Sequence, residues 1–306
     1  MNSALIFIFG AIALALALGL LARRGKNMSL EEWAVGGRGF GTAIVFLLMA
    51  GEIYTTFVFL GASGYAYGHG GPAYYMLGYG SLCFVLSYWL LPPIWRYAKA
   101  KNLISQSDFF ASKYDSRPLG ILIAVVGIVA LMPYLVLQFK GLGIIVSVAS
   151  YGAIDSSHGM WIGAFVVALY VAISGVHGSA WTSVVKDMLV MFVAVFLGLY
   201  LPFHYHGGVG QMFADIEAAK PGFLALRESG ESPVWLVSTV LLSALGFYMW
   251  PHMFMATYTA NSDVVLRKNA YVLPIYQLML LLSSSSDLLQ FCRFPGSKEA
   301  TSISHY

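Results

Sequence analysis

The residues best suited to chemistry lie in the middle of two long apolar stretches. The first stretch, residues 40–61, is interrupted by GEIYTT at positions 51–56, and the second, residues 234–257, by GFYMWPH at positions 246–252. A hydrocarbon core offers no hydrogen bonds to irregular backbone, so such segments persist at that depth only where they line a cavity or hold a ligand. Interrupted helices at matching places in two halves of a chain indicate the binding site of a transporter.

Glu52 is the ionisable residue near the middle of the first stretch. A charged side chain at that depth costs about 2.5 to 3.5 kcal/mol on insertion scales and usually has a function. We expect Glu52 to contribute its carboxylate or its exposed backbone to a cation site. The alternative is a structural glutamate that is protonated or paired with a lysine. Thr55 and Thr56 add hydroxyls for a solute, although threonine also bonds back to its own helix.

Gln138 and Lys140 lie inside another apolar stretch, residues 119–150. Lys140 could receive a substrate carboxylate or pair with Glu52, and the alternative is that its long side chain reaches one membrane surface. Tyr248 and Trp250 could cover a solute pocket, but aromatic residues in spans are also common packing and interface residues. These side chains complete the candidate solute site.

Ser183 and Asp187 are four residues apart and therefore share one face of a helix. With Lys186 they open the apolar stretch 184–204 at its cytoplasmic side, where they could line an inner exit path for a cation. An interfacial salt bridge or a helix cap is the alternative. For His252 we expect a hydrogen-bonded structural role, with proton coupling as the alternative.

The composition predicts an integral membrane protein. Hydrophobic residues make up 58% of the 306 residues and charged residues only 10%, against about 25% charged in a soluble domain. Seven stretches are long enough to span, and they are residues 4–22, 40–61, 73–97, 119–150, 159–175, 184–204 and 234–257. An eighth, 270–283, is shorter than the roughly 20 residues that a spanning helix needs. The first lacks the features of a cleaved signal and is interpreted as a helix.

Lysine and arginine gather in the odd-numbered connections between these stretches, whereas the even-numbered ones hold only Lys220 and Arg227. Basic connections remain in the cytoplasm, so the N-terminus is predicted to lie outside. The net charge of +3 follows from this topology and indicates no nucleic-acid partner. The expected location is the plasma (inner) membrane of a bacterium, in which the chain is a multi-pass protein in contact with the lipid bilayer.

The two interrupted stretches are five crossings apart, which predicts an inverted five-helix repeat. The predicted parts are residues 1–39, an extra N-terminal helix and cytoplasmic loop; 40–204, the first repeat; 205–233, an irregular external loop; 234–283, the start of a second repeat; and 284–306, an atypical polar tail.

The sequence argues against an enzyme. Cys83 and Cys292 form neither a disulfide framework nor a metal cluster. No spacing matches a nucleophile elbow, a phosphate-binding loop or a zinc site. No cofactor is expected other than a coupling ion.

Several segments in order along the chain carry a family resemblance, and they are residues 32–38, 92–96, 105–114, 170–182 and 251–262. Together they resemble the sodium:solute symporter family, from Glu32 to about Leu282. Residues 52–57 and 91–96 look most like its bacterial monocarboxylate permease branch, which handles lactate, pyruvate and similar acids.

The resemblance implies an all-α membrane protein with the LeuT-like transporter fold of two inverted five-helix repeats. It also implies sodium-driven uptake by alternating access, with Na⁺ held by backbone carbonyls near Met49 and Glu52 and by hydroxyls of the eighth core helix. Substrate contacts would lie near Tyr54, Thr55, Thr56, Tyr248 and Trp250. An anionic substrate would give Lys140 a purpose, which favours a small organic acid such as lactate or pyruvate.

Two departures from the family matter. Ser183 stands where many relatives have an aspartate, so an inner sodium relay would use Asp187 instead. The resemblance stops before the eighth core helix, so we expect a complete first repeat, an incomplete second repeat and a C-terminally truncated chain that alone does not complete the ion site. The alternatives are a non-functional truncated symporter fragment and a membrane sensor domain derived from a symporter.

Overall fold

The computed structural model describes residues 3–279, and helices dominate this part of the chain. Within it the only β-type pairing is an isolated parallel bridge between Phe40 and Ala260. The α-helices are α1 (Ser3–Arg23), α2 (Leu30–Val35), α3 (Thr42–Gly51), α4 (Ser63–His69), α5 (Tyr75–Ala100), α6 (Gln106–Lys113), α7 (Arg117–Ala149), α8 (Ser156–His206), α9 (Val209–Ala219), α10 (Pro233–Gly246), α11 (Pro251–Tyr258) and α12 (Asp263–Gln277).

Several helices are long and apolar enough to cross a membrane. They are α1, α7, α8 and the segment Gly71–Ala100, which contains α5. The bent pair of helices Pro233–Met249 and Pro251–Tyr258 adds one more if it is counted as a single span. α8 has 51 residues and contains Gly175 at φ 53° and ψ −145°, a conformation that favours glycine. The predicted stretches 159–175 and 184–204 fall on either side of this bend, which explains how one helix accounts for two predicted spans.

Both predicted interruptions are confirmed. α3 ends at Gly51, residues 52–55 form turns and bends, and a π-helical segment, η2 (Phe57–Ala62), continues the chain. α10 ends at Gly246, a short 3₁₀ segment, η4 (Phe247–Met249), follows, and the direction changes by 57° before α11. Neither stretch is an unbroken α-helix.

The prediction of an irregular connection over residues 205–233 was wrong in part, because α9 lies within it. Met212 and Ile216 are one helical turn apart and both are fully buried. α9 is therefore amphipathic, and its narrow apolar face is buried. The predicted stretch 270–283 begins within α12, whereas its last residues and the predicted polar tail 284–306 lie outside the described residues.

The chain forms two compact units. Unit 1 contains Met1–Glu52, Trp89–Lys186 and Tyr248–Lys268, and unit 2 contains Ile53–Tyr88, Asp187–Phe247 and the chain from Asn269 onward. The boundaries of the predicted repeats stay predictions.

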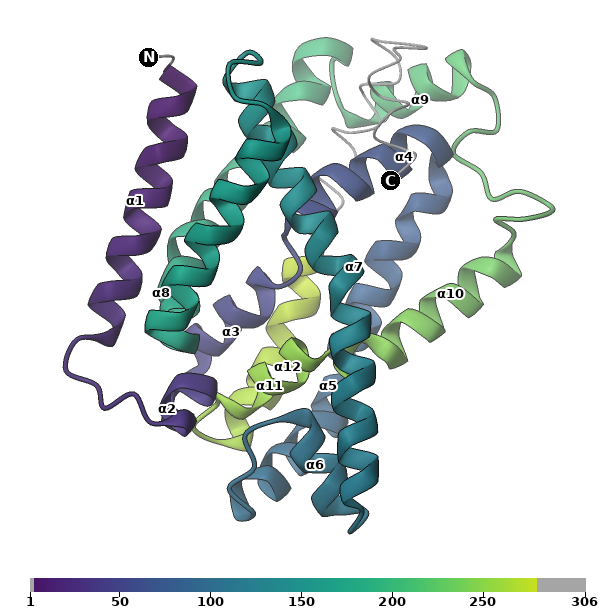
Figure 1. The fold of residues 1–306 in the computed structure, drawn as a ribbon. Coiled ribbons are helices and arrows are strands. Elements are labelled where there is room, and N and C mark those ends of the chain that lie inside the picture. Colours follow the sequence, from purple (N-terminus) through teal and green to yellow (C-terminus); the bar gives the residue numbers. More distant parts are fainter. Residues whose placement is uncertain (1–2, 280–306) are drawn as a thin grey trace. The chain divides into compact units, whose positions relative to one another are not determined.

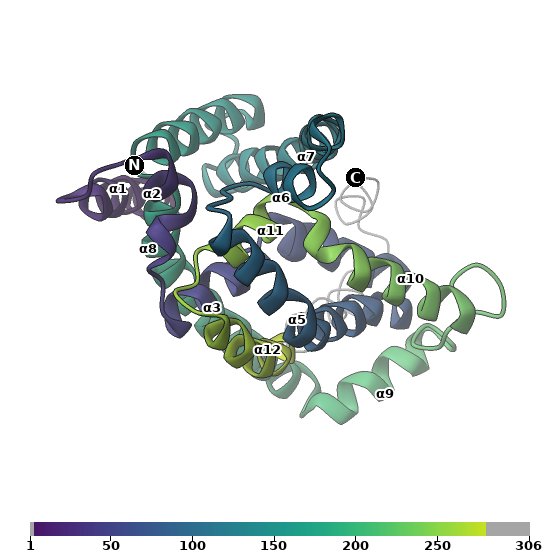
Figure 2. The ribbon, with the colours of Figure 1, turned by 90° about the horizontal axis from the view of Figure 1, so that it is seen from below.

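In unit 1, α11 packs against α2, α3 and α6, and the neighbourhood of α6 and α11 can be followed in Figure 2. Its buried centre combines Val35, Ala98, Phe254 and Tyr258. α1 lies beside the first half of α8 (Figure 1), where a side chain at Gly19 would meet the Ser174 hydroxyl.

In unit 2, the segment between α9 and α10 is fastened to the end of α4. The Glu231 carboxylate accepts a hydrogen bond from the Tyr65 hydroxyl and lies 2.6 Å from Nδ1 of His69. The amide of Gly71 donates to the Phe223 carbonyl at 3.0 Å. These contacts hold the long connection close to the helix end that follows the first interruption.

Candidate ion and solute site

The first interruption leaves backbone carbonyls at the end of α3. The amide of Glu52 donates to the carbonyls of Leu48 and Ala50, which satisfies two of the terminal acceptors. Among the described residues, no backbone amide donates to the carbonyl of Met49 or of Glu52. The two carbonyls predicted to hold a cation are therefore left without the amide partners that a continuous helix would supply.

The carbonyl of Gly51 has a partner from a distant helix, because the ammonium of Lys186 on α8 donates to it. Lys186 lies inside α8, about three helical turns beyond the bend at Gly175. Its place at the cytoplasmic side of the stretch 184–204 stays a prediction.

The two residues predicted to line an inner path lie on the same stretch of α8. Ser183 is 8% exposed and Asp187 is 3% exposed, whereas Lys186 is an exposed residue. The three residues fall within one face of the helix, since positions three and four apart are neighbours. Their role in an inner path stays a prediction.

Tyr54, Thr55 and Thr56 lie in the second half of the first interruption and belong to unit 2. The Thr55 hydroxyl accepts a hydrogen bond from the amide of Phe57 at 3.3 Å, a local bond at the start of the segment that resumes the helix. The Tyr54 hydroxyl donates to the carbonyl of Tyr276 at 3.2 Å. These two side chains have structural partners, and contact with a solute stays a prediction for all three.

Pro251 produces the second interruption. Proline has no amide hydrogen and disfavours the helical conformation in the preceding residue, and Trp250 accordingly has ψ 126°. α11 then starts with Pro251 in its first turn, and the amide of Phe254 donates to the carbonyl of Trp250 at 2.9 Å. The side-chain amide (Nε2) of Gln106 on α6 donates to the carbonyl of Met249 at 2.9 Å, a support that the sequence did not predict.

α7 covers the second interruption within unit 1. The ring of Tyr134 lies 5.4 Å from the ring of Trp250 and 5.6 Å from that of His252, with which it stacks. A side chain at Gly127 would meet Pro251 at 2.8 Å, so a residue without a side chain permits the close approach.

The structure separates the two candidate residues of α7. Gln138 comes one helical turn after Tyr134 and lies on the same face, toward the second interruption. Lys140 lies on a different face and is exposed. Tyr248 is fully buried in η4, and Trp250 is partly buried.

The two interruptions meet through an ion pair that the sequence analysis did not anticipate. Nε2 of His252 lies 3.6 Å from the carboxylate of Glu52, and both side chains are about one-third exposed. Each residue is an ionisable group in the middle of an apolar stretch, and this shared feature is the signal that could have paired them.

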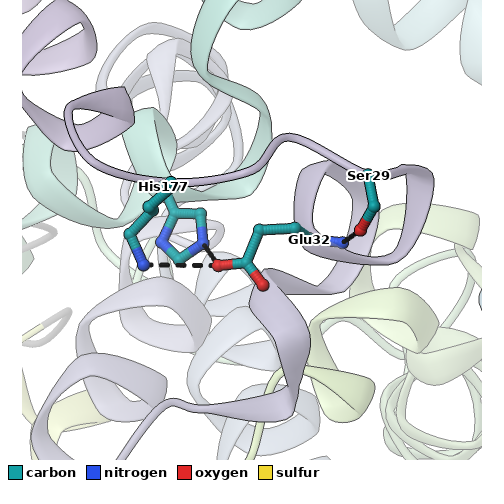
Figure 3. Close-up of polar contacts among 4 residues, drawn as sticks. Ser29, Glu32 and His177 are labelled. Carbon is teal, nitrogen blue, oxygen red and sulfur yellow. Dashed lines mark hydrogen bonds and ion pairs between the residues drawn. The ribbon is translucent and has the colours of Figure 1, made fainter.

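A second polar cluster connects the start of α2 to the bend of α8. Oε1 of Glu32 lies 2.7 Å from Nε2 of His177 and 3.3 Å from the ammonium of Lys26, while the Ser29 hydroxyl accepts from the amide of Glu32 (Figure 3). Ser29 and Glu32 have the spacing of a capping box, which is the part of this cluster visible in the sequence.

The charges of this cluster depend on one another. Burial acts to raise the pKa of the Glu32 carboxyl, but the hydrogen bonds and charges of His177 and Lys26 outweigh it and lower that pKa. Burial lowers the pKa of the His177 imidazole, and Glu32 offsets only part of this effect. Glu32 therefore stays ionised, and His177 is held toward its neutral form.

Comparison with known proteins decides the family. The sequence profile of the sodium:solute symporter family matches residues 33–289. The chain belongs to the sodium:solute symporter family. It is 63% identical over 281 residues to a protein named "Uncharacterized symporter YhjB" from Bacillus subtilis, covering 92% of this chain and 58% of that protein.

Two further matches extend the comparison. A "Monocarboxylate transport permease protein" from Rhizobium johnstonii is 29% identical over 282 residues, covering 90% of this chain and 56% of that protein. A solved structure of a Na⁺-coupled sialic acid symporter has a TM-score of 0.78 at 14% identity, covering 98% of this chain and 64% of that one. The chain thus spans somewhat more than half the length of these relatives.

These matches confirm the family resemblance and the all-helical transporter fold predicted from the sequence. The family is one of membrane transporters and not of enzymes. The substrate named for the Rhizobium permease is a property of that protein.

Proposed function

We propose that this chain forms the ion- and solute-binding part of a sodium-coupled symporter for a small monocarboxylate such as lactate or pyruvate. The observation that carries the proposal is the first interruption, where α3 stops at Gly51 within an apolar stretch. Backbone carbonyls freed by unwinding coordinate Na⁺ well in transporters. The carbonyls of Met49 and Glu52 are the proposed sodium ligands.

The second interruption supports an anionic solute. α11 begins at Pro251 in the middle of an apolar stretch, and the positive end of a helix favours a carboxylate. The proposed solute contacts are Tyr54, Thr55, Thr56, Gln138, Lys140, Tyr248 and Trp250. The similarity to a monocarboxylate permease supports this substrate class.

The proposal includes a bacterial inner membrane, an N-terminus outside, and an inner cation path along Ser183 and Asp187. Membership of a sodium:solute symporter family and the bacterial relatives support this location.

Uptake into proteoliposomes tests the function. Labelled pyruvate, lactate and proline are supplied to vesicles holding the 306-residue chain, and to vesicles holding a chimera that continues from residue 279 with the matching C-terminal part of the Bacillus subtilis relative. Uptake of pyruvate or lactate that needs an inward Na⁺ gradient supports the proposal. Proline uptake, or uptake equal with K⁺, contradicts the substrate or the coupling ion respectively.

Three variants test the solute site within the transporting protein. Thr56→Ala and Gln138→Ala are expected to raise the half-saturating solute concentration several-fold. Lys140→Ala is expected to reduce the preference for lactate or pyruvate over proline. Ser63→Ala serves as the matched control, because the Ser63 hydroxyl donates locally to the carbonyl of Phe59. Unaltered uptake in all three variants would remove the proposed solute site.

A further inference from the structure

The Lys186 contact brings a cation of the protein to the first interruption. Lys186 comes from α8, and Gly51 is the last residue of α3, so the two are far apart in the sequence. The ammonium of Lys186 donates to the Gly51 carbonyl, which lies between the carbonyls of Met49 and Glu52 along the chain. Both residues belong to unit 1.

A helix C-terminus attracts cations because its last carbonyls carry partial negative charge. An ammonium on the Gly51 carbonyl and a sodium ion on the nearby carbonyls of Met49 and Glu52 would be two like charges held close together, and like charges repel each other. The lysine and a bound sodium ion therefore oppose each other's binding at the end of α3.

The surroundings allow this lysine to move. Lys186 is an exposed residue, whereas Gly51 is buried, and a lysine side chain has four rotatable methylene groups. Asp187 follows Lys186 directly on α8, and Glu52 follows Gly51 directly and is paired with His252. The Glu52 carboxylate provides negative charge next to the end of α3 whether the positive charge is lysine or sodium.

We propose that Lys186 is a tethered cation that occupies the Gly51 carbonyl and must leave before sodium binds at the neighbouring carbonyls of Met49 and Glu52. Lys186 thereby sets the sodium affinity of the site. The inference rests on the proposed sodium site at the first interruption and assigns a regulator to it.

Sodium-induced stabilisation of the purified chimera with the Bacillus subtilis relative tests the inference. Thermal midpoints are recorded in detergent over a series of NaCl concentrations, with choline chloride keeping the ionic strength constant, since a ligand that binds the folded state raises the midpoint. The proteins, each made as the chimera, are the unmodified chain, Lys186→Met, Lys186→Arg, and Lys99→Met as a control for the loss of one exposed lysine.

Lys186→Met is expected to lower the half-saturating sodium concentration by about tenfold, because it removes the competitor and keeps the length of the side chain. Lys186→Arg keeps the charge and is expected to stay within about twofold of the unmodified chain, as is Lys99→Met. Equal sodium responses of Lys186→Met and the unmodified chain would overturn the inference and leave the proposed sodium site standing. A chain in which no variant responds to sodium more than to choline would overturn both.

A second measurement needs no variant. An amine-acylating reagent is applied to the unmodified chain, and modification of each lysine is followed by mass spectrometry. Sodium is expected to raise the acylation rate of Lys186 several-fold over the rate in choline and to leave Lys99 unchanged. A Lys186 rate that sodium does not change, in a chain that sodium stabilises, overturns displacement of the lysine.

Discussion

The two interrupted segments reach the same outcome by different means. At the second, Pro251 removes an amide and keeps Trp250 out of the helical conformation, so the residues themselves force the break. The first contains no proline between α3 and η2, and Glu52 still has helical angles of φ −71° and ψ −20°. Its irregular backbone is held by contacts, including the Lys186 ammonium on Gly51 and the hydroxyl of Thr55 on the following turn.

A break that is caused by proline is therefore a fixed feature of the backbone. A break that is held by contacts changes with the groups that bind its carbonyls and hydroxyls. A segment whose carbonyls exchange partners suits ion binding. A segment fixed by its own sequence suits a rigid wall, and α7 packs on it through Gly127 and Tyr134. The bend of α8 at Gly175 belongs to the fixed class.

The largest expected effect comes from Gly175→Ala. The backbone conformation there favours glycine, and an added Cβ would lie 2.3 Å from the carbonyl oxygen of Trp33. We expect the free energy of unfolding to fall by about 2 kcal/mol or more, measured by denaturation in detergent. Gly10→Ala is the control, because no atom lies within 4 Å of an added Cβ in α1. Equal stability of the two variants would contradict a bend fixed by residue type.

Pro251→Ala should have a smaller effect. It permits Trp250 to become helical and removes the packing of the ring against Gly127, so stability should fall by about 1 kcal/mol and the fluorescence of Trp250 should change. Pro93→Ala, within the continuous helix α5, should leave the tryptophan signal unchanged. An identical spectrum for Pro251→Ala and the unmodified chain would mean that contacts, and not proline, hold the second break.

Thr55→Ala addresses the contact-held break. Loss of the hydroxyl that accepts from Phe57 should cost about 1 kcal/mol, and Thr55→Ser should restore most of it. The measurement is the thermal midpoint, with Ser63→Ala as a control that removes only a local bond to Phe59. If serine fails to rescue, the threonine acts through its methyl group instead of its hydroxyl.

The smallest effect should be a dependence on pH at the cluster that anchors the bend. The lowered pKa of His177 means that the unfolded chain takes up this proton first, so stability should decline as the pH falls below the ordinary value of about 6.5. The lowered pKa of Glu32 adds a loss below its ordinary value of 4.5. Thermal midpoints between pH 8 and pH 5, compared with those of His177→Gln, measure the first step. The glutamine variant should lack it, and an unchanged slope would assign the acid sensitivity elsewhere.

The sequence predicted the membrane class, both interruptions and the family, because these depend on hydrophobic length and on residues such as Pro251 that act locally. It did not predict α9, since its two buried residues form a short pattern between turn-forming residues. It did not predict the contact of Lys186 with Gly51, because a lysine at the start of an apolar run gives no sign of a partner on a distant helix.

The sequence alone determined where the helices are interrupted, because proline, glycine and a run of polar residues have local conformational preferences that do not depend on the rest of the fold. Only the tertiary structure decided which groups meet there. Lys186 with Gly51, His252 with Glu52 and His177 with Glu32 each join residues from distant segments. The physical reason is that an unpaired carbonyl or charge in an apolar environment has a high free energy, which a hydrogen bond or an opposite charge lowers. The packing of the helices decides which partner is within reach.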